Sequence, residues 1–402
     1  MLNARSLALA TASILAIASP HPANAGNVIT TSGNRILNNG KPFLPNGVVF
    51  DMSAPIALLQ SYAKTYVNSF VNGRIQAYDY YFGLDDSSQG VNFTSGKDAI
   101  SVMQKSWAAV PPAKAPWGIN TLRFNVDEAA LNSTSPQYSG YVSEIKSAVS
   151  RAEAAGYVVD LALFDERDGN APYTPFWVDN PETPLDNATT EAAALTLAKF
   201  YGKDQNVLIE LLNEPFPPVT PAVSWGYWAN GGVDTSTGQW DGATFVGVNA
   251  EIAAIRNAGA LNAIIVQGLS FSFVGFQYNV VDPLNRVIYS VHPFPNSVAP
   301  NTTTWNSEFG TVAATLPVLI TAWNTNSNQA WCTSATYDTP YNFLSYLNSL
   351  NVGVIGYGFD VPATIVKALN GNPTLWPASC GLQGGPGQIM QKYYTSGIVP
   401  LP

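Results

Sequence analysis

The stretch Val207-Leu-Ile-Glu-Leu-Leu-Asn-Glu-Pro-Phe216 decides the fold class of this chain. Its first six residues are apolar apart from Glu210, which is typical of a short strand buried on both faces. Pro215 cannot continue a strand ladder, so the strand ends with Asn213 and Glu214 at its carboxyl tip. In a parallel α/β barrel, catalytic side chains lie at such tips. An ordinary turn that leaves Glu214 in solvent is the alternative.

Seven other segments have the length and composition of buried strands, with amphipathic helical patterns between them. The predicted strands are 43–50, 119–126, 157–164, 207–212, 263–267, 287–292, 318–321 and 352–359. The predicted helices are 138–155, 190–201, 243–258, 304–314, 342–350 and 387–394, and a further helical pattern covers 56–70. This alternation predicts an α/β fold, a single (β/α)8 TIM barrel. A doubly wound open sheet is the alternative, weakened by the absence of a Gly-rich phosphate loop after the first strand.

Residues 1–25 have the pattern of a secretory signal peptide. Arg5 supplies the basic start, an apolar run covers 7–18, and Ala23-Asn-Ala25 forms a small-residue cleavage site. The run is too short to span a bilayer. We therefore expect cleavage after Ala25, secretion to an extracellular or periplasmic location, no membrane partner, and a single domain over 26–402.

The formal net charge of the chain is −9, and an acidic surface argues against nucleic acid as a partner. Few charged residues (11%) beside 12% aromatic residues are typical of exported carbohydrate-active proteins, and we expect a monomer. His292 is the one histidine beyond the expected cleavage site, and the chain has no CxxC motif. We therefore expect neither a metal site nor a cofactor.

The chain contains two cysteines, Cys332 and Cys380. In an exported protein an even pair predicts one disulfide. It would close a loop of about 50 residues and add about 3–4 kcal/mol of stability on the chain-entropy account. Two free thiols are the alternative.

Polar side chains lie at the ends of the even-numbered predicted strands. In chain order they are Arg123, Asn213, Glu214, His292, Tyr357 and Asp360. Because the carboxyl ends of barrel strands share one rim, we expect these groups to converge there. The alternatives are a buried ion pair for Arg123 and a structural role for His292.

Several motifs fall in order on the predicted strands. They are Trp117-Gly-Ile-Asn-Thr-Leu-Arg123, Asn213-Glu214-Pro215, Ile265-Val-Gln-Gly268, Tyr289-Ser-Val-His292, and Trp305 with Phe309-Gly310 and Pro317-Val-Leu-Ile-Thr321. In these motifs the chain resembles family 5 of the glycoside hydrolases, the cellulase-like retaining β-glycanases, across residues 34–395. The resemblance implies a catalytic (β/α)8 domain that hydrolyses O-glycosidic bonds of a β-linked polysaccharide or oligosaccharide, of the endo-β-glucanase or mannanase type.

By this resemblance Glu214 is the general acid/base, and Asn213 holds the sugar 2-hydroxyl. Arg123 would steady the nucleophile, and His292 would frame the cleavage subsite. Glycoside hydrolysis needs one carboxylic acid to protonate the leaving oxygen, and a second carboxylate to attack the sugar or to activate water. In the family the second carboxylate ends strand seven, but here Ala322 stands in its place.

Ala322 leaves the nucleophile position vacant, and we expect Arg123 to lack an anionic partner. Glu308, in Glu308-Phe-Gly310, resembles the family's strand ending, but only 15 residues separate it from His292. That is too few for a crossover and a strand, so we expect Glu308 on the intervening helix. Three further residues stand where the family usually has a histidine, a tyrosine and a tryptophan: Ala162, Phe294 and Tyr357.

Three interpretations of the vacant position stay open. The first is a retaining enzyme that lacks its nucleophile through a natural or engineered replacement. The second is a relocated carboxylate, with Asp360, Asp165 or Glu166 as candidates, that activates water about 6.5–9.5 Å from Glu214 and gives inversion. The third is a pseudoenzyme that binds a glycan without cutting it.

Aromatic side chains near the rim are candidates for stacking on sugar rings, which present apolar C–H faces. The candidates are Trp225, Tyr227, Trp228 and Trp240 in the loop after Glu214, and Trp323 after strand seven. We expect Trp228, Trp323 and Tyr357 to bind substrate. Packing of some of these rings inside the loops is the alternative.

Overall fold

The computed structural model describes most of the chain. It describes residues 26–50, 117–128, 130–134, 138–164, 185–216, 220–237, 240–272, 276, 280–295, 300–324, 334–359, 365–366 and 386–397. Several predictions lie outside the described residues: the signal peptide, the helical pattern over 56–70, the pair Cys332 and Cys380, and the carboxylates Asp165, Glu166 and Asp360. These stay predictions.

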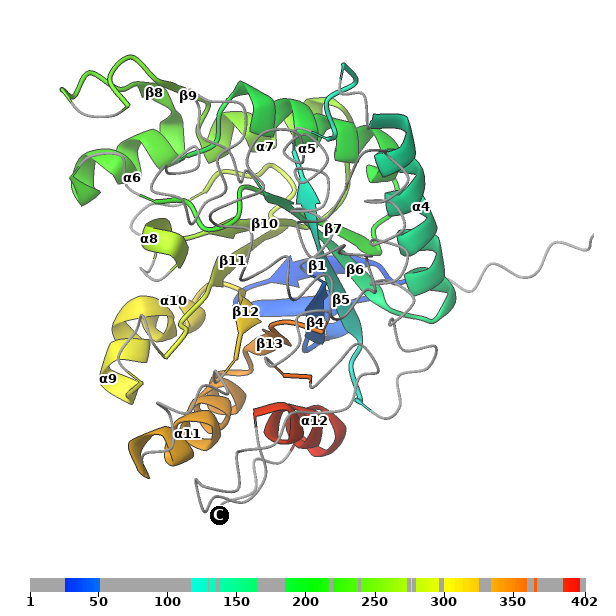
Figure 1. Cartoon of the computed structure of the whole chain (residues 1–402), viewed down its shortest axis with the longest axis vertical. Helices are drawn as coiled ribbons and strands as arrows, with labels where there is room; N and C mark the ends of the chain where they lie inside the picture. The colour runs from blue at the N-terminus through cyan, green and yellow to red at the C-terminus, as the bar shows by residue number, and fades with distance from the viewer. Residues whose placement is uncertain are drawn as a thin grey trace, which may run out of the picture.

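Eight parallel strands close into a barrel in the order in which they follow along the chain. They are β4 (Asn46–Phe50), β5 (Thr121–Asp127), β6 (Val158–Phe164), β7 (Val207–Glu210), β10 (Ile264–Gln267), β11 (Val287–Val291), β12 (Val318–Trp323) and β13 (Gly353–Gly356). β13 pairs with β4 and closes the ring. Figure 1 shows the strands at the centre with helices around them. The predicted (β/α)8 barrel is confirmed, and the open sheet is wrong because the ring has no free edge.

Each helix predicted within the described residues is present. The helices are α4 (Tyr138–Ala154), α5 (Ala188–Tyr201), α7 (Val248–Asn257), α9 (Thr302–Trp305), the π-helix η1 (Asn306–Gly310), α10 (Thr311–Ala313), α11 (Ser334–Leu350) and α12 (Pro386–Ser396). Asn187 begins α5, because its side chain accepts the backbone N–H of Thr189 at 2.6 Å. Across the described ranges, no helix combines the length and the hydropathy needed to cross a membrane.

Some short elements were not predicted. They are α6 (Pro221–Asn230), α8 (Leu269–Ser272) and the hairpin of β8 (Gly232–Val233) with β9 (Thr244–Phe245). α6, β8 and β9 all lie between β7 and β10, so this βα loop is the elaborated one. Their sequences carry aromatic residues without a clear helical or strand period, which is why the sequence did not place them.

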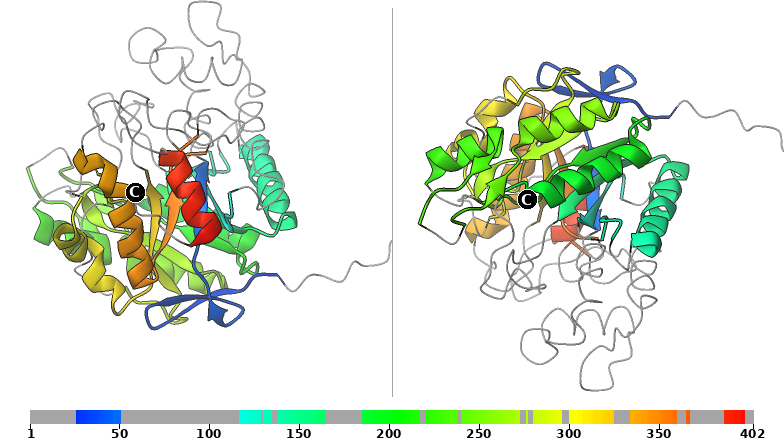
Figure 2. Two further views of the ribbon diagram at one scale, coloured as in Figure 1. Left: turned by 90° about the horizontal axis from the view of Figure 1, so that it is seen from below. Right: turned by 90° about the horizontal axis from the view of Figure 1, so that it is seen from above.

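The N-terminal residues seal one end of the barrel. β1 (Ile29–Ser32), β2 (Arg35–Asn38) and β3 (Lys41–Pro42) form an antiparallel sheet, shown in blue in Figure 2. Ile29 and Ile36 are buried in one apolar cluster with side chains from the barrel interior, among them Val49, Leu208 and Ile355. The N–H of Ile29 also donates to the carbonyl of Gln205, just before β7, at 3.0 Å. The amino ends of the strands are therefore covered, and a site is expected at their carboxyl ends.

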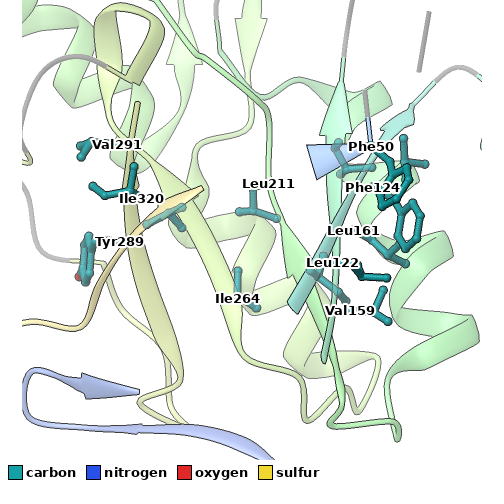
Figure 3. Close-up of a cluster of buried hydrophobic side chains, with 14 of the residues drawn as sticks. Phe50, Leu122, Phe124, Val159, Leu161, Leu211, Ile264, Tyr289, Val291 and Ile320 are labelled. Carbon is teal, nitrogen blue, oxygen red and sulfur yellow. The ribbon is translucent and has the colours of Figure 1, made fainter. Parts of the chain in front are cut away.

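Strand residues alternate between the barrel interior and the helix layer. Leu122 and Phe124 on β5 belong to the outer apolar cluster, part of which Figure 3 shows, and Phe124 stacks on Phe50 at 5.2 Å between ring centroids. Arg123 and Asn125, the alternate residues of the same strand, are buried and joined by a hydrogen bond of 2.8 Å. Polar residues on the inner face must find partners there, because water does not reach them.

Three buried acidic side chains outside the barrel strands act on one another: Glu128, Asp186 and Glu251. Burial, and then the charge of Asp186, raise the pKa of Glu251 well above its usual value. Burial also raises the pKa of Asp186. Asp186 Oδ1 accepts the backbone N–H of Leu212 at 3.3 Å, so these carboxyl groups lie behind the segment that leads to Glu214.

We expect Glu251→Gln to stabilise the protein at neutral pH and above. The pKa of Glu251 is higher in the folded chain, so the cost of ionising it is absent below the unfolded pKa of about 4.3 and grows as pH rises through the folded pKa. Calorimetry should give a Tm at least about 2 °C above wild type at pH 8 and an equal Tm at pH 4. Asp241→Asn, at an exposed position, is the control, and a gain that is equal at both pH values would contradict the expectation.

Candidate active site

Arg123 is the centre of a hydrogen-bond network that crosses the barrel interior. Its Nε donates to Glu210 Oε2 at 2.5 Å, its Nη1 to Asn125 Oδ1 at 2.8 Å, and its Nη2 to Asn213 Oδ1 at 2.7 Å. The expectation that Arg123 lacks an anionic partner is wrong, because Glu210 on β7 provides one. Arg123 is 1% exposed, so it supports Asn213 from below and does not itself offer atoms to a ligand.

Arg123, Glu210 and Asp160 form a buried layer of ionisable side chains that affect one another's charge. Burial opposes ionisation of Glu210, but the charge and hydrogen bond of Arg123 lower the pKa of Glu210 below its usual value. Burial, and then the charge of Glu210, raise the pKa of Asp160 well above its usual value, although Asp160 Oδ2 lies 3.7 Å from Arg123 Nε. The charges of Arg123 and Glu210 therefore compensate each other, and Asp160 is the carboxyl group that gives up its charge more readily, which limits the desolvation cost.

Gln267, the last residue of β10, connects this layer to Glu214. Its Nε2 donates to Glu210 Oε1 at 2.6 Å and to Asn213 Oδ1 at 3.1 Å, while its Oε1 accepts the backbone N–H of Glu214 at 2.7 Å. Because these partners differ in kind, they determine which atom of the Gln267 side-chain amide is the oxygen and which is the nitrogen. Glu214 has a φ of +52°, a left-handed conformation that costs a glutamate about 1–3 kcal/mol. The hydrogen bond from its N–H holds the residue in that conformation.

The carboxyl group of Glu214 is paired with His292, which follows β11. Glu214 Oε1 lies 2.8 Å from His292 Nδ1, and His292 Nε2 lies 2.8 Å from Thr321 Oγ1. The Glu214 side chain is 25% exposed and that of His292 is 1% exposed. The predicted convergence of these strand ends is therefore observed: Glu214 faces the solvent side of the site, and His292 acts from behind it.

An irregularity in β12 decides which way its last residues face. Ile320 pairs with Val354 and Trp323 with Gly356, so three steps along β12 match two steps along β13. Such a β-bulge places two successive residues on one face. Thr321 donates to Glu210 Oε1 inside the barrel at 2.7 Å, and Ala322 belongs to the apolar cluster of the barrel interior. Ala322 thus faces the barrel mouth beside Thr321.

Aromatic side chains pack against the apolar cluster to which Ala322 belongs. Phe294 and Tyr357 are partly buried and pack against the apolar cluster that contains Ala322. Their ring centroids are 6.1 Å apart at 89°, and the Phe294 ring lies 6.2 Å from that of His292. The hydroxyl of Thr321 contacts His292. The next residue, Ala322, has only a methyl group as its side chain.

The geometry above agrees with a family match. A model of the cellulase family (glycosyl hydrolase family 5) matches residues 84–360, more than half of the chain. The chain belongs to glycosyl hydrolase family 5. A search of the curated proteins finds no match.

Solved structures with a similar fold include family 5 glucanases and mannanases. A β-glucanase from Saccharophagus degradans in complex with cellotetraose has a TM-score of 0.56 and 17% identity, over 92% of this chain and 94% of that chain. The cellulase Cel5C_n has a TM-score of 0.54 and 13% identity, over 92% of each chain. A β-mannanase from Streptomyces thermolilacinus with mannohexaose has a TM-score of 0.51 and 14% identity, over 87% of this chain and 91% of that chain. At these identities the likeness bears on the fold alone.

Glu308 does not lie on β12, the strand at whose end the resemblance to family 5 implies a second carboxylate. It lies in η1, on the connection between β11 and β12, as the sequence spacing predicts. Phe309, the next residue, packs against Phe343 of α11 in the helix layer. The Glu308-Phe-Gly310 motif is therefore a helical segment outside the barrel.

Two tryptophans predicted to bind sugar are buried elsewhere. Trp323 is 1% exposed, stacks on Phe343 of α11 at 4.5 Å, and donates from Nε1 to the carbonyl of Pro293 at 3.1 Å. Trp228 is also 1% exposed, and its Nε1 donates to the carbonyl of Gln267 at 3.1 Å. Neither ring has a free face, so their predicted role in substrate binding is not supported by this placement.

The other candidate rings divide in the same way. Trp225 is buried against Trp228, with ring centroids 5.0 Å apart. Trp240 and Tyr227 are only partly buried, as is Tyr357. Trp240 lies 6.3 Å from the ring of Phe216, two residues beyond Glu214. Trp240 and Tyr357 are therefore the candidate rings that keep exposed surface near the strand ends.

Sequence reasoning did not assign a role to four residues of the network: Glu210, Gln267, Ser290 and Thr321. Each is a polar residue inside or at the end of an apolar strand, and each is buried. Their signal in the sequence is a polar side chain at an alternate position of a buried strand, which must have a partner in the barrel. In the same described part of the chain, no cluster of histidine, cysteine and acidic residues is arranged to hold a metal ion.

We expect Arg123→Met to destabilise the protein by about 3–5 kcal/mol, because Glu210 would remain buried without its cation. Chemical denaturation at neutral pH measures this loss. Lys203→Met removes an exposed cation and should change the free energy of unfolding by less than about 0.5 kcal/mol. A loss below about 1 kcal/mol for Arg123→Met would show that the ion pair is not a structural requirement.

Proposed function

We propose that this chain acts on β-linked glucan or mannan chains through a retaining-type site in which Glu214 is the general acid/base and the nucleophile is absent. The observation that carries the proposal is the pairing of Glu214 with His292, at 2.8 Å, above the buried network at the carboxyl end of the barrel. Glycosidases use a carboxylic acid to protonate the leaving oxygen, and Glu214 is a partly exposed carboxyl group held in place at this rim. The oligosaccharides bound to the structural relatives, cellotetraose and mannohexaose, support a β-linked glycan as ligand.

Asn213 is proposed to hold a sugar hydroxyl. Its Oδ1 accepts two hydrogen bonds, from Arg123 Nη2 at 2.7 Å and from Gln267 Nε2 at 3.1 Å. This leaves the Nδ2 hydrogens of Asn213 as the donors directed away from the network. A hydroxyl of the sugar beside Glu214 fits them as acceptor.

The alanine at position 322 sets the limit on turnover. A methyl group cannot attack the anomeric carbon, so no glycosyl-enzyme forms with this residue. A small external anion can take the role: azide forms a bond to the anomeric carbon while the bond to the leaving oxygen breaks. With a β-glycoside this single displacement gives an α-glycosyl azide.

We expect azide or formate to restore cleavage of 2,4-dinitrophenyl β-cellobioside or β-mannobioside. The rate of phenolate release should rise at least about 10-fold with the anion, since the protein still positions the sugar, and the α-glycosyl azide should be detected. Ala322→Val, which fills the space beside Thr321, is the matched control and should abolish the effect. Two results would contradict the proposal that the anion acts in the space at position 322. One is a rate that does not change with the anion, and the other is an equal rate increase in the valine variant.

Replacing the methyl group by a carboxylate tests the same position directly. We expect Ala322→Glu to raise kcat on the aryl glycoside by about 10³-fold or more, since removal of a catalytic nucleophile costs up to ~10⁶ in kcat. Retention of configuration in the product, followed by NMR, is the second measurement. The double variant Ala322→Glu with Glu214→Gln should lose turnover of substrates with poor leaving groups.

A carbohydrate-binding pseudoenzyme is the second candidate function, favoured by the same alanine. Titration calorimetry with cellotetraose and mannohexaose distinguishes the two. Binding without anion rescue would favour the pseudoenzyme. Hydrolysis without added anion and with inversion would favour a relocated base among Asp360, Asp165 and Glu166.

Export of the chain belongs to this proposal. The signal-peptide pattern over 1–25 supports secretion, and the pair Cys332 and Cys380 supports a disulfide in the mature protein. The mass of the secreted protein under non-reducing conditions, after thiol alkylation, tests both.

A further inference from the structure

The hydroxyl of Thr321 has more partners than one hydrogen can serve. Its Oγ1 lies 2.7 Å from Glu210 Oε1, 2.5 Å from Ser290 Oγ and 2.8 Å from His292 Nε2. Ser290 lies on β11, His292 follows β11, and Thr321 lies on β12. These three side chains and that of Glu210 are buried. A hydroxyl donates one hydrogen and accepts up to two, so the three contacts determine one another.

The single hydrogen of Thr321 goes to Glu210. Glu210 is bound to Arg123 at 2.5 Å through its other oxygen, and that ion pair keeps Glu210 ionised and therefore able only to accept. The lowered pKa of Glu210 agrees with this state. Both remaining contacts of Thr321 Oγ1 must then be donated to it, by the hydroxyl of Ser290 and by an N–H at His292 Nε2. A bare nitrogen lone pair at 2.8 Å from a lone pair of Thr321 would be repulsive.

We propose that Thr321 is a positioning residue that fixes the hydrogen of His292 on Nε2, so that His292 Nδ1 and Glu214 share one further proton. With Nε2 carrying its hydrogen, the contact of 2.8 Å between Nδ1 and Glu214 Oε1 is a hydrogen bond only if a proton lies between them. This proton belongs to the pair, as Glu214 carboxylic acid with neutral imidazole or as Glu214 carboxylate with imidazolium.

The assignment explains how the buried layer acts on the acid/base. Glu210 is too deep to touch a ligand, yet through Thr321 it determines that the ring nitrogen facing Glu214 is the one that can exchange a proton with it. Glu214 Oε1 is occupied by this exchange, and Oε2 is the oxygen left to face the glycosidic oxygen. Only this consequence rests on the proposed function of Glu214; the position of the hydrogen on His292 does not.

The ¹⁵N NMR spectrum of histidine-labelled full-length protein, at neutral pH and without substrate, tests the proposal. The chain has two histidines, His21 and His292, so the spectrum of His292→Asn identifies the signals of His292. We expect Nε2 of His292 to carry a slowly exchanging hydrogen. Thr321→Val has the same shape without the hydroxyl. It should lose the Nε2–H signal, and the hydrogen of the neutral ring should lie on Nδ1, because Glu214 is then the remaining acceptor.

Two variants separate this role from simple packing. Thr321→Ser keeps the hydroxyl and should restore the Nε2–H signal, and Ser290→Ala removes a neighbouring hydroxyl and should leave that signal in place. An unprotonated Nε2 in the wild type would overturn the proposal, and this measurement is decisive even if Thr321→Val does not fold. Unchanged nitrogen signals in a folded Thr321→Val would overturn it as well. A failure of azide rescue bears on the proposed function and leaves these results untouched.

Discussion

The ion pair between Arg123 and Glu210, at 2.5 Å inside the barrel, is the interaction on which the rest of the site depends. Two charges removed from water are stable only when their remaining hydrogen-bonding groups are also satisfied. Four polar side chains meet this requirement, each through a hydrogen bond to one of the two charged groups: Asn125, Asn213, Gln267 and Thr321. Two of these, Gln267 and Thr321, hold the backbone of Glu214 and the ring of His292. The geometry of the exposed acid is thus set by a pair that no ligand touches.

The β-bulge in β12 decides which way the last three residues of that strand face. It turns both Thr321 and Ala322 toward the barrel, and it sends Trp323 outward to stack on α11. Without the bulge, Ala322 would face the helix layer and Trp323 the mouth, by simple alternation. The direction in which residue 322 faces is therefore decided by the pairing of β12 with β13.

The network is complete without an acid at position 322. Glu210 satisfies Arg123, and Glu210 with His292 satisfies Thr321, so the alanine leaves no buried charge unpaired. Among the described residues, the partners of Arg123, Glu210 and Thr321 do not include the side chain at 322, so the buried network does not depend on that side chain. The aromatic rings of Phe294 and Tyr357 pack against the apolar cluster that includes Ala322. The carboxyl group of Glu214 is thus held in place by His292, while the residue after Thr321 carries only a methyl group.

The sequence by itself determined the number and order of the barrel strands, since apolar runs of strand length and helical periods are local patterns. It also determined that Asn213 and Glu214 follow β7, because the apolar run stops just before them. It determined as well that Glu308 lies on a helix, because the chain from His292 is too short for another strand. Only the tertiary structure decided that Arg123 has a carboxylate partner, because Glu210 is 87 residues away along the chain. It likewise decided which way Ala322 and Trp323 face, because a bulge is a mismatch between two strands and cannot be read from one. The burial of Trp228 and Trp323 was decided in the same way, by partners such as Gln267 and Phe343 that come from other elements.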